Sequence, residues 1–95
     1  MKIILTPHAK KAAMDRGISP SLIRKTVKKP DGKYFDIERK SVVAVKNVKY
    51  YRKNKDIQVF FHYEGGDAII HTVHPARKNE IKNKIKLRRY IPFNV

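Results

Sequence analysis

The most informative stretch of the chain is IQVFFHYEGGDAIIHTVH, residues 57–74. Two runs rich in β-branched and aromatic residues flank Gly65-Gly66, and a Gly-Gly pair between such runs is typical of a two-residue hairpin turn. A turn of this length sets the pairing of the strands, so we expect Glu64 to face Asp67. The stretch therefore predicts an antiparallel β-hairpin with a defined register.

This register sorts the side chains of the hairpin into two faces. His62 and His71 fall on the more polar face, which we expect to be open to solvent or to a ligand. As diagonal neighbours, their Cα atoms should lie about 7–8 Å apart. Phe60 should then face His71. The other face is mostly apolar, should be covered by helices, and holds Ile57, Val59, Phe61, Tyr63, Ala68, Ile70, Thr72 and His74.

Two helices are predicted before this sheet. Thr6 can cap the first helix, and Gly17 can supply the left-handed residue that ends it. Ser19 can cap the second helix, which ends at Pro30. From residue 33 onward the hydrophobic period becomes that of strands, with candidates at residues 34–37, 41–52, 57–64 and 67–74.

After the hairpin the chain returns to a helical pattern over residues 76–89. Ile81 and Ile85 form the inward side of this helix, and its remaining face is almost entirely Lys and Arg. Residues 90–95 are apolar enough to dock back on the domain, and an extended tail is the alternative.

The length of 95 residues suits one domain, because a chain this short needs most of its residues for a single hydrophobic core. We expect that domain to span residues 1–95, with a core at 1–75 and a basic extension at 76–95. The predicted fold is α+β: two N-terminal helices packed on a three- or four-stranded antiparallel sheet, followed by a basic C-terminal helix.

Net charge is the strongest feature of the composition. Lys and Arg number 23 against 8 Asp and Glu, a formal charge of +15 at pH 7. The excess lies at the two ends, since residues 1–30 hold eight basic and one acidic side chain and residues 77–95 hold seven and one. Such a charge favours a polyanionic partner, and nucleic acid is the commonest one. An acidic membrane surface is the weaker alternative, because no stretch approaches the roughly 20 apolar residues of a membrane span.

The absence of cysteine excludes disulfides, thiolate nucleophiles and cysteine-ligated zinc. The apolar run at the start of the chain stops at Leu5, which is too short for a secretory signal peptide. We therefore expect a cytoplasmic protein that needs no metal and no other cofactor.

Four short segments carry a resemblance to a known family: Thr6-Pro7-His8-Ala9, Asp15-Arg16-Gly17-Ile18-Ser19, Pro30-Asp31 and Ile69-Ile70-His71-Thr72-Val73. They resemble a widespread prokaryotic family of small domains of unknown function, over roughly residues 4–75. That family is similar to the barnase, EndoU, colicin and RelE-type ribonuclease superfamily. The resemblance implies a RelE-like fold, with helices before a curved antiparallel sheet, and an endoribonuclease toxin that cleaves RNA on the open sheet face. The matched polar positions are His8, Arg16 and Thr72, whereas His74 and the helix after it lie outside the pattern.

Cleavage of RNA without a metal needs a base for the ribose 2′-OH, an acid for the leaving 5′-oxygen and cations beside the phosphorane. We expect His8 and His71 to transfer the protons and Arg16 to hold the phosphate. Thr72 should point to the helix-covered side and support the site through a buried hydrogen bond to His8 or Arg16. The plainer alternatives are a local hydrogen bond for His8 and a favourable position at a helix C-terminus for Arg16.

Contacts to nucleic acid should come from basic side chains spread over the helices and strands. Tyr50, Tyr51 and Tyr63 lie among some of them, as base stacking beside phosphate contacts requires. The expected partners are RNA, free or as ribosome-bound mRNA, and an acidic antitoxin protein. The candidate nucleic-acid-binding residues are Lys10, Lys11, Lys28, Lys29, Lys46, Lys49, Arg52, Arg77, Lys78, Lys82, Arg88 and Arg89.

Two other functions remain open. Ala13, Gly17 and Ile23 have the spacing of a DNA-binding helix-turn-helix, although Pro20 lies at the start of what would be the reading helix. The other alternative is an RNA-binding accessory protein without catalytic activity. Loss of His8 or His71 should abolish cleavage in a nuclease and should not matter in either alternative.

Overall fold

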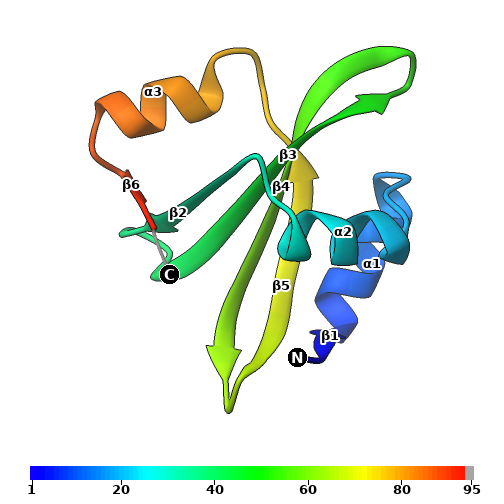
Figure 1. The fold of residues 1–95 in the computed structure, drawn as a ribbon. Coiled ribbons are helices and arrows are strands. Elements are labelled where there is room, and N and C mark those ends of the chain that lie inside the picture. The colour runs from blue at the N-terminus through cyan, green and yellow to red at the C-terminus, as the bar shows by residue number, and fades with distance from the viewer. Residues whose placement is uncertain (94–95) are drawn as a thin grey trace.

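The computed structural model describes residues 1–93. Its elements are, in chain order, β1 (Ile3–Leu5), α1 (Pro7–Asp15), α2 (Pro20–Lys28), β2 (Gly32–Asp36), β3 (Ser41–Tyr50), β4 (Lys53–Glu64), β5 (Asp67–Pro75), α3 (Glu80–Lys86) and β6 (Tyr90–Pro92). The six strands in this part of the chain form one sheet in the order β1-β5-β4-β3-β2-β6 (Figure 1). β1 runs parallel to β5, and the other neighbouring strands are antiparallel.

The predicted α+β class is confirmed, but the predicted sheet of three or four antiparallel strands is too small. The sheet is mixed, because β1 adds a parallel strand at one edge. β1 and β6 have three residues each, which is too short for a period-two pattern to stand out in the sequence.

The two N-terminal helices begin and end where the sequence predicts. The Thr6 hydroxyl accepts a hydrogen bond from the Ala9 backbone N–H at 3.1 Å, and Gly17 has a φ of 65°. The Ser19 hydroxyl accepts from the backbone N–H of Leu22 at 3.1 Å. These caps satisfy N–H groups that have no partner within the helix.

No helix within residues 1–93 is long and apolar enough to cross a membrane.

Each face of the sheet has its own apolar core. Phe61 and Ile70 belong to the core under α1 and α2, which lie together on one side of the sheet (Figure 1). Phe60 and Val43 belong to the core on the opposite face, where Ile81 of α3 and Tyr90 of β6 pack. This second face, called the open face below, is covered in part by α3, and the side chains of β5 on it are partly exposed.

The C-terminal segment belongs to the core. Tyr90 is 1% exposed, and β6 pairs with β2, so residues 90–93 dock back on the domain. The predicted helix over residues 76–89 is shorter in the structure, because Asn79 and Arg88 adopt left-handed backbone conformations on either side of α3. Asn94 and Val95, the last residues of the predicted apolar end, lie outside the described residues.

The β4–β5 hairpin confirms the predicted pairing near its turn, where Glu64 faces Asp67. Further from the turn the register shifts between Phe60 and Phe61, since β5 carries one extra residue there. Phe60 consequently faces Thr72, and the predicted pairing of Phe60 with His71 is wrong.

This β-bulge changes which side chains share a face. Thr72 lies opposite Phe60, and His74 lies opposite Gln58, on the open face. The predicted positions of Thr72 and His74 on the helix-covered face are therefore wrong, and so is the buried hydrogen bond from Thr72 to His8 or Arg16. The prediction assumed strict alternation along both strands, which a bulge interrupts.

Candidate functional site

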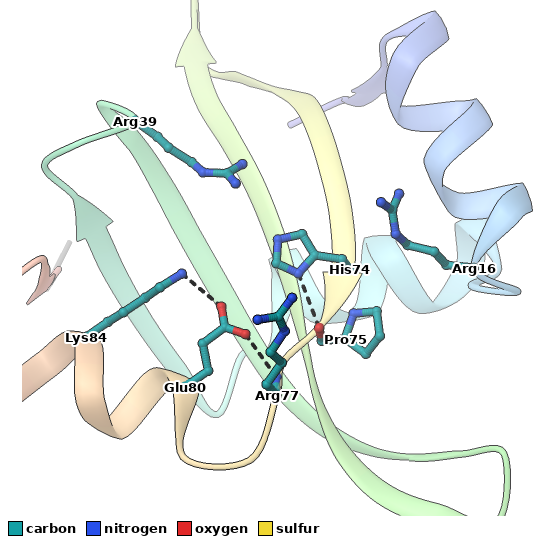
Figure 2. A pocket seen from close by; sticks show the side chains of 7 residues that line it. All are labelled: Arg16, Arg39, His74, Pro75, Arg77, Glu80 and Lys84. Carbon is teal, nitrogen blue, oxygen red and sulfur yellow. Dashed lines mark hydrogen bonds and ion pairs between the residues drawn. The ribbon is translucent and has the colours of Figure 1, made fainter.

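A cleft of about 450 Å³ lies on the open face at the end of β5. Figure 2 shows its side chains converging from five segments: the end of α1, the turn between β2 and β3, the end of β5, the loop after it and α3. Four of the lining side chains are cations and one, Glu80, is a carboxylate, so the positive charge of the cleft is suited to an anion. The lining residues are Arg16, Arg39, His74, Pro75, Arg77, Glu80 and Lys84.

Arg16 reaches this cleft because of the short β1 strand. Within residues 1–93, β1 pairs with β5 only at Ala68–Ile70, so the later part of β5 forms an edge of the sheet. The end of α1 lies beside that edge, and Arg16 extends toward His74 from there (Figure 2). Arg16, the residue predicted to hold a phosphate, thus lies at the wall of a cleft lined by four cations.

His74 is the imidazole of the cleft. Its ring stacks on Phe60 with centroids 5.0 Å apart, and its Nδ1 lies 3.2 Å from the carbonyl oxygen of Pro75. Nδ1 also lies 3.4 Å from the Gln58 amide nitrogen, a donor, but the shorter contact is to a carbonyl oxygen that only accepts; it favours the tautomer with the proton on Nδ1 and the lone pair on Nε2.

Burial lowers the pKa of His74 below its usual 6.5. The Pro75 hydrogen bond and the Glu80 carboxylate oppose this shift, and the cations Arg39 and Arg16 add to it. The imidazole is therefore neutral at pH 7 and able to accept a proton.

Glu80 anchors the opposite wall of the cleft. Its carboxylate accepts hydrogen bonds from the Arg77 backbone N–H at 2.9 Å, from Lys84 at 2.8 Å and from the Gln58 amide at 3.0 Å. Burial alone would raise the pKa of Glu80, but these donors outweigh it and lower the pKa to about 2. Glu80 is thus ionised at neutral pH and holds Lys84 in place.

A buried network beneath the cleft fixes this wall. Gln58 is fully buried, and Tyr90 donates from its hydroxyl to the Gln58 side-chain oxygen at 2.6 Å. The Gln58 nitrogen must then face Glu80, and it also lies 3.4 Å from Nδ1 of His74. Burial raises the pKa of Tyr90 well above 10, so its hydroxyl keeps its proton. The only sign of this network in the sequence is a polar residue in the middle of an apolar strand.

A second hollow, of about 320 Å³, adjoins the cleft through Arg39, which lines both. Its other walls are Ser41, Phe60, His71 and Thr72. Arg39 lies over the Phe60 ring, 4.6 Å from its centroid. The two hollows therefore lie along one face, on either side of a guanidinium.

His71 forms a pair with His62 beside this second hollow. Nε2 of His71 lies 2.7 Å from Nδ1 of His62, and the Glu64 carboxylate lies 3.2 Å from Nε2 of His62. Burial lowers the pKa of His71, and the facing imidazole of His62 lowers it further. An ionised carboxylate only accepts, so neutral His62 donates to Glu64 and accepts from His71.

The predicted catalytic residues separate into two groups. Arg16, His71 and Thr72 line the two adjoining hollows. His8 is exposed in the first turn of α1 and is not among the lining residues of either hollow. The sequence predicted no role for the other polar residues of the site: Arg39, Ser41, Gln58, His74, Glu80 and Lys84.

The predicted nucleic-acid-binding residues also differ in their surroundings. Arg77 lines the cleft. Lys46 donates to the carbonyl oxygen of Lys29 at 2.9 Å, and Arg89 forms ion pairs with Asp36 and Glu38 at 3.3 Å, so both cations have partners within the fold. The others are exposed: Lys10, Lys11, Lys28, Lys29, Lys49, Arg52, Lys78, Lys82 and Arg88.

Within residues 1–93, no three histidine or carboxylate side chains come close enough together to hold a metal ion. Comparisons of the chain with models of protein families, with curated proteins and with solved structures gave no match. The function therefore has to be inferred from the side chains of the open face.

Proposed function

We propose that this protein is a metal-independent endoribonuclease that cleaves RNA on the open face of its sheet. The observation that carries the proposal is the β-bulge between Phe60 and Phe61, because it brings His71 and His74 to the same face. In a regular strand, residues three positions apart point to opposite faces. Bulges are frequent beside active sites, where they redirect a side chain.

His74 is the proposed general base. Its Nε2 carries a free lone pair, and burial keeps the ring neutral at pH 7. Removal of the proton from the ribose 2′-OH makes that oxygen the nucleophile, which attacks the neighbouring phosphorus. The leaving group is the 5′-oxygen, and the product keeps a 2′,3′-cyclic phosphate.

The His62–His71 pair is the proposed general acid. In the neutral pair the 2.7 Å gap already holds the Nε2–H proton of His71, so an added proton binds Nδ1 of His71, the one ring nitrogen of the pair with a free lone pair, and is delivered from there. Burial and the facing His62 imidazole lower the pKa of His71, so the protonated ring gives up this proton readily. Three residues of extended chain span roughly 10 Å, so His71 and His74 can approach opposite sides of one phosphodiester.

The cations supply the electrostatic part of the mechanism. Arg39 lies between the two hollows and is placed to contact the phosphate as charge develops on it. Arg16 and Lys84 line the cleft on either side of His74. Glu80 offsets one of these charges and leaves the cleft positive overall.

A toxin role is part of this proposal. The resemblance of the chain's opening to the RelE-like superfamily supports it, and the charge of +15 suits both an RNA substrate and an acidic antitoxin. Induced expression should then arrest growth, and His74→Ala should relieve the arrest at equal protein level. Arrest by both proteins alike would argue against nuclease-based toxicity.

The test is cleavage of end-labelled RNA in EDTA, with and without translating ribosomes. We expect products ending in 2′,3′-cyclic phosphate, and a loss of rate of about 100- to 10,000-fold in His74→Ala and in His71→Ala. His8→Ala is the control and should cleave like the wild type, since His8 does not line either hollow.

Binding provides the second measurement on the same proteins. His74→Ala should bind RNA with nearly the wild-type affinity, because the cations of the cleft remain. Tight, salt-sensitive binding by the wild type without cleavage in either format would replace the nuclease by a non-catalytic nucleic-acid-binding function. A comparison of RNA with duplex DNA would then identify the preferred polymer.

A further inference from the structure

The turn between β3 and β4 has an unusual backbone for its residues. Tyr50 pairs with Lys53, so Tyr51 and Arg52 form a two-residue hairpin loop. Their φ angles are 48° and 67°, in the left-handed region that turns of this kind require and that Gly, Asn and Asp occupy most readily. A bulky aromatic side chain is disfavoured at such a position.

The other hairpin of the same sheet shows the usual solution. Gly65 and Gly66 form the β4–β5 turn with φ angles of 57° and 87°. Tyr51 and Arg52 are the one consecutive pair of non-glycine residues with positive φ within residues 1–93. Strained backbone of this kind is concentrated at functional sites.

Packing in the core does not explain why a tyrosine occupies this left-handed turn position, because Tyr51 is 74% exposed. Its ring packs edge-on with the ring of Tyr50 at a centroid distance of 4.6 Å, and its hydroxyl lies against Gly17. An aromatic ring is thus held in a defined orientation with most of its surface open to solvent. Lys49 and Lys53 are exposed on either side of the turn.

The turn is tied directly to the wall of the cleft. The Tyr50 hydroxyl donates to the backbone carbonyl oxygen of Arg16 at 2.5 Å, and the Arg16 side chain lines the cleft beside His74. Tyr51 contacts the next residue, Gly17. The exposed Tyr51 ring thus lies beside the end of α1 that carries Arg16, and Arg52 is the exposed neighbour of Tyr51 in the turn.

We propose that the Tyr51-Arg52 turn is a binding subsite for single-stranded RNA, in which Tyr51 stacks on a nucleobase and Arg52 contacts a phosphate. The subsite extends the cleft beyond the scissile phosphate and rests on the proposed nuclease function. Every nucleobase has a stackable face, so the subsite selects unpaired strands and not a particular base. In a duplex the bases are already stacked on their neighbours and are not free to bind the ring.

The test uses a substitution that should affect stability and binding in opposite directions. Asn is favoured at left-handed turn positions, so Tyr51→Asn should leave the melting temperature unchanged or raise it. Its affinity for a fluorescein-labelled, single-stranded 2′-O-methyl RNA of twelve nucleotides should fall by about 5- to 100-fold, measured by anisotropy. Tyr51→Phe keeps the ring and should keep the affinity.

Tyr63→Asn is the matched control: the sequence grouped Tyr63 with the stacking tyrosines, but it lies opposite Ala68 on the helix-covered face, away from the cleft, and its hydroxyl accepts from Lys33. The proposal is overturned if Tyr51→Asn binds the single strand like the wild type, if Tyr63→Asn weakens binding as much, or if duplex RNA loses as much affinity as the single strand. The 2′-O-methyl group blocks 2′-OH attack, so binding is measured apart from cleavage. Absence of cleavage of ordinary RNA by the wild type would refute the nuclease and not the subsite.

Discussion

Glu80→Gln tests the network that holds the cleft wall, and its effect on stability should depend on pH. The carboxylate uses one oxygen for the Arg77 N–H and the other for Gln58 and Lys84. A Gln side chain can accept on only one of these sides and turns an N–H₂ group toward donors on the other. The substitution therefore removes at least one charge-assisted hydrogen bond from a side chain that is 16% exposed.

The magnitude follows from the shift in the pKa of Glu80 from 4.5 to about 2. At 1.36 kcal/mol per pH unit, the ionised form contributes about 3 kcal/mol to the free energy of unfolding. Because the folded-state pKa is the lower one, this contribution is complete above pH 4.5 and is lost as the pH falls toward 2. Less than about half should remain at pH 3.

Urea unfolding followed by circular dichroism between pH 7 and pH 3 measures this directly. We expect Glu80→Gln to unfold with about 2–3 kcal/mol less free energy at pH 7, and with a melting temperature roughly 10–20 °C lower. Glu38→Gln is the control, since Glu38 is an exposed carboxylate paired with Arg89 and its loss should cost less than about 1 kcal/mol. Equal costs for the two variants, or a difference that does not shrink with falling pH, would refute the network.

Two further predictions concern stability. Gln58→Leu should lower the free energy of unfolding, measured by urea unfolding, by about 2–4 kcal/mol, because it leaves the buried Tyr90 hydroxyl without its acceptor. A loss below about 1 kcal/mol would mean that the network rearranges around the leucine. Gly17→Ala should cost about 1–2 kcal/mol, since its φ is 65° and the new Cβ would lie 2.5 Å from the Tyr51 hydroxyl oxygen. The double variant with Tyr51→Asn should recover part of that cost, and no recovery would place the strain in the backbone alone.

The sequence could predict the features that depend on neighbouring residues. Thr6 and Ser19 cap their helices through hydrogen bonds three residues away, and Gly17 ends α1, so the N-terminal helices were recognisable. Gly65-Gly66 defined the central hairpin for the same reason. β1 and β6 depend on pairing with distant strands, and three residues carry too little pattern to reveal that.

The β-bulge explains why the candidate site was predicted only in part. A regular register places Thr72 and His74 under the helices, and one extra residue in β5 moves both to the open face. Nothing in the local sequence marks that residue. Arg39 and Glu80 come from segments far apart along the chain, and they meet His74 only when α3 folds over the sheet.

The resemblance to the ribonuclease superfamily pointed to His8, and the structure separates that residue from the two hollows. Arg16, from the same motif, lines the cleft because α1 ends beside the free edge of β5. Of the three polar positions matched by the resemblance, Arg16 and Thr72 therefore line the two hollows and His8 does not.

The most direct measurement of the central claim is an NMR titration of the four histidine side chains with an uncleavable 2′-O-methyl RNA strand. Long-range proton–nitrogen spectra report the tautomer and protonation of each ring separately. We predict that the signals of His71 and His74 shift together, with one dissociation constant, while the signals of His8 stay in place. A shift of His8 without shifts of His71 and His74 would contradict a phosphate-binding site on the open face.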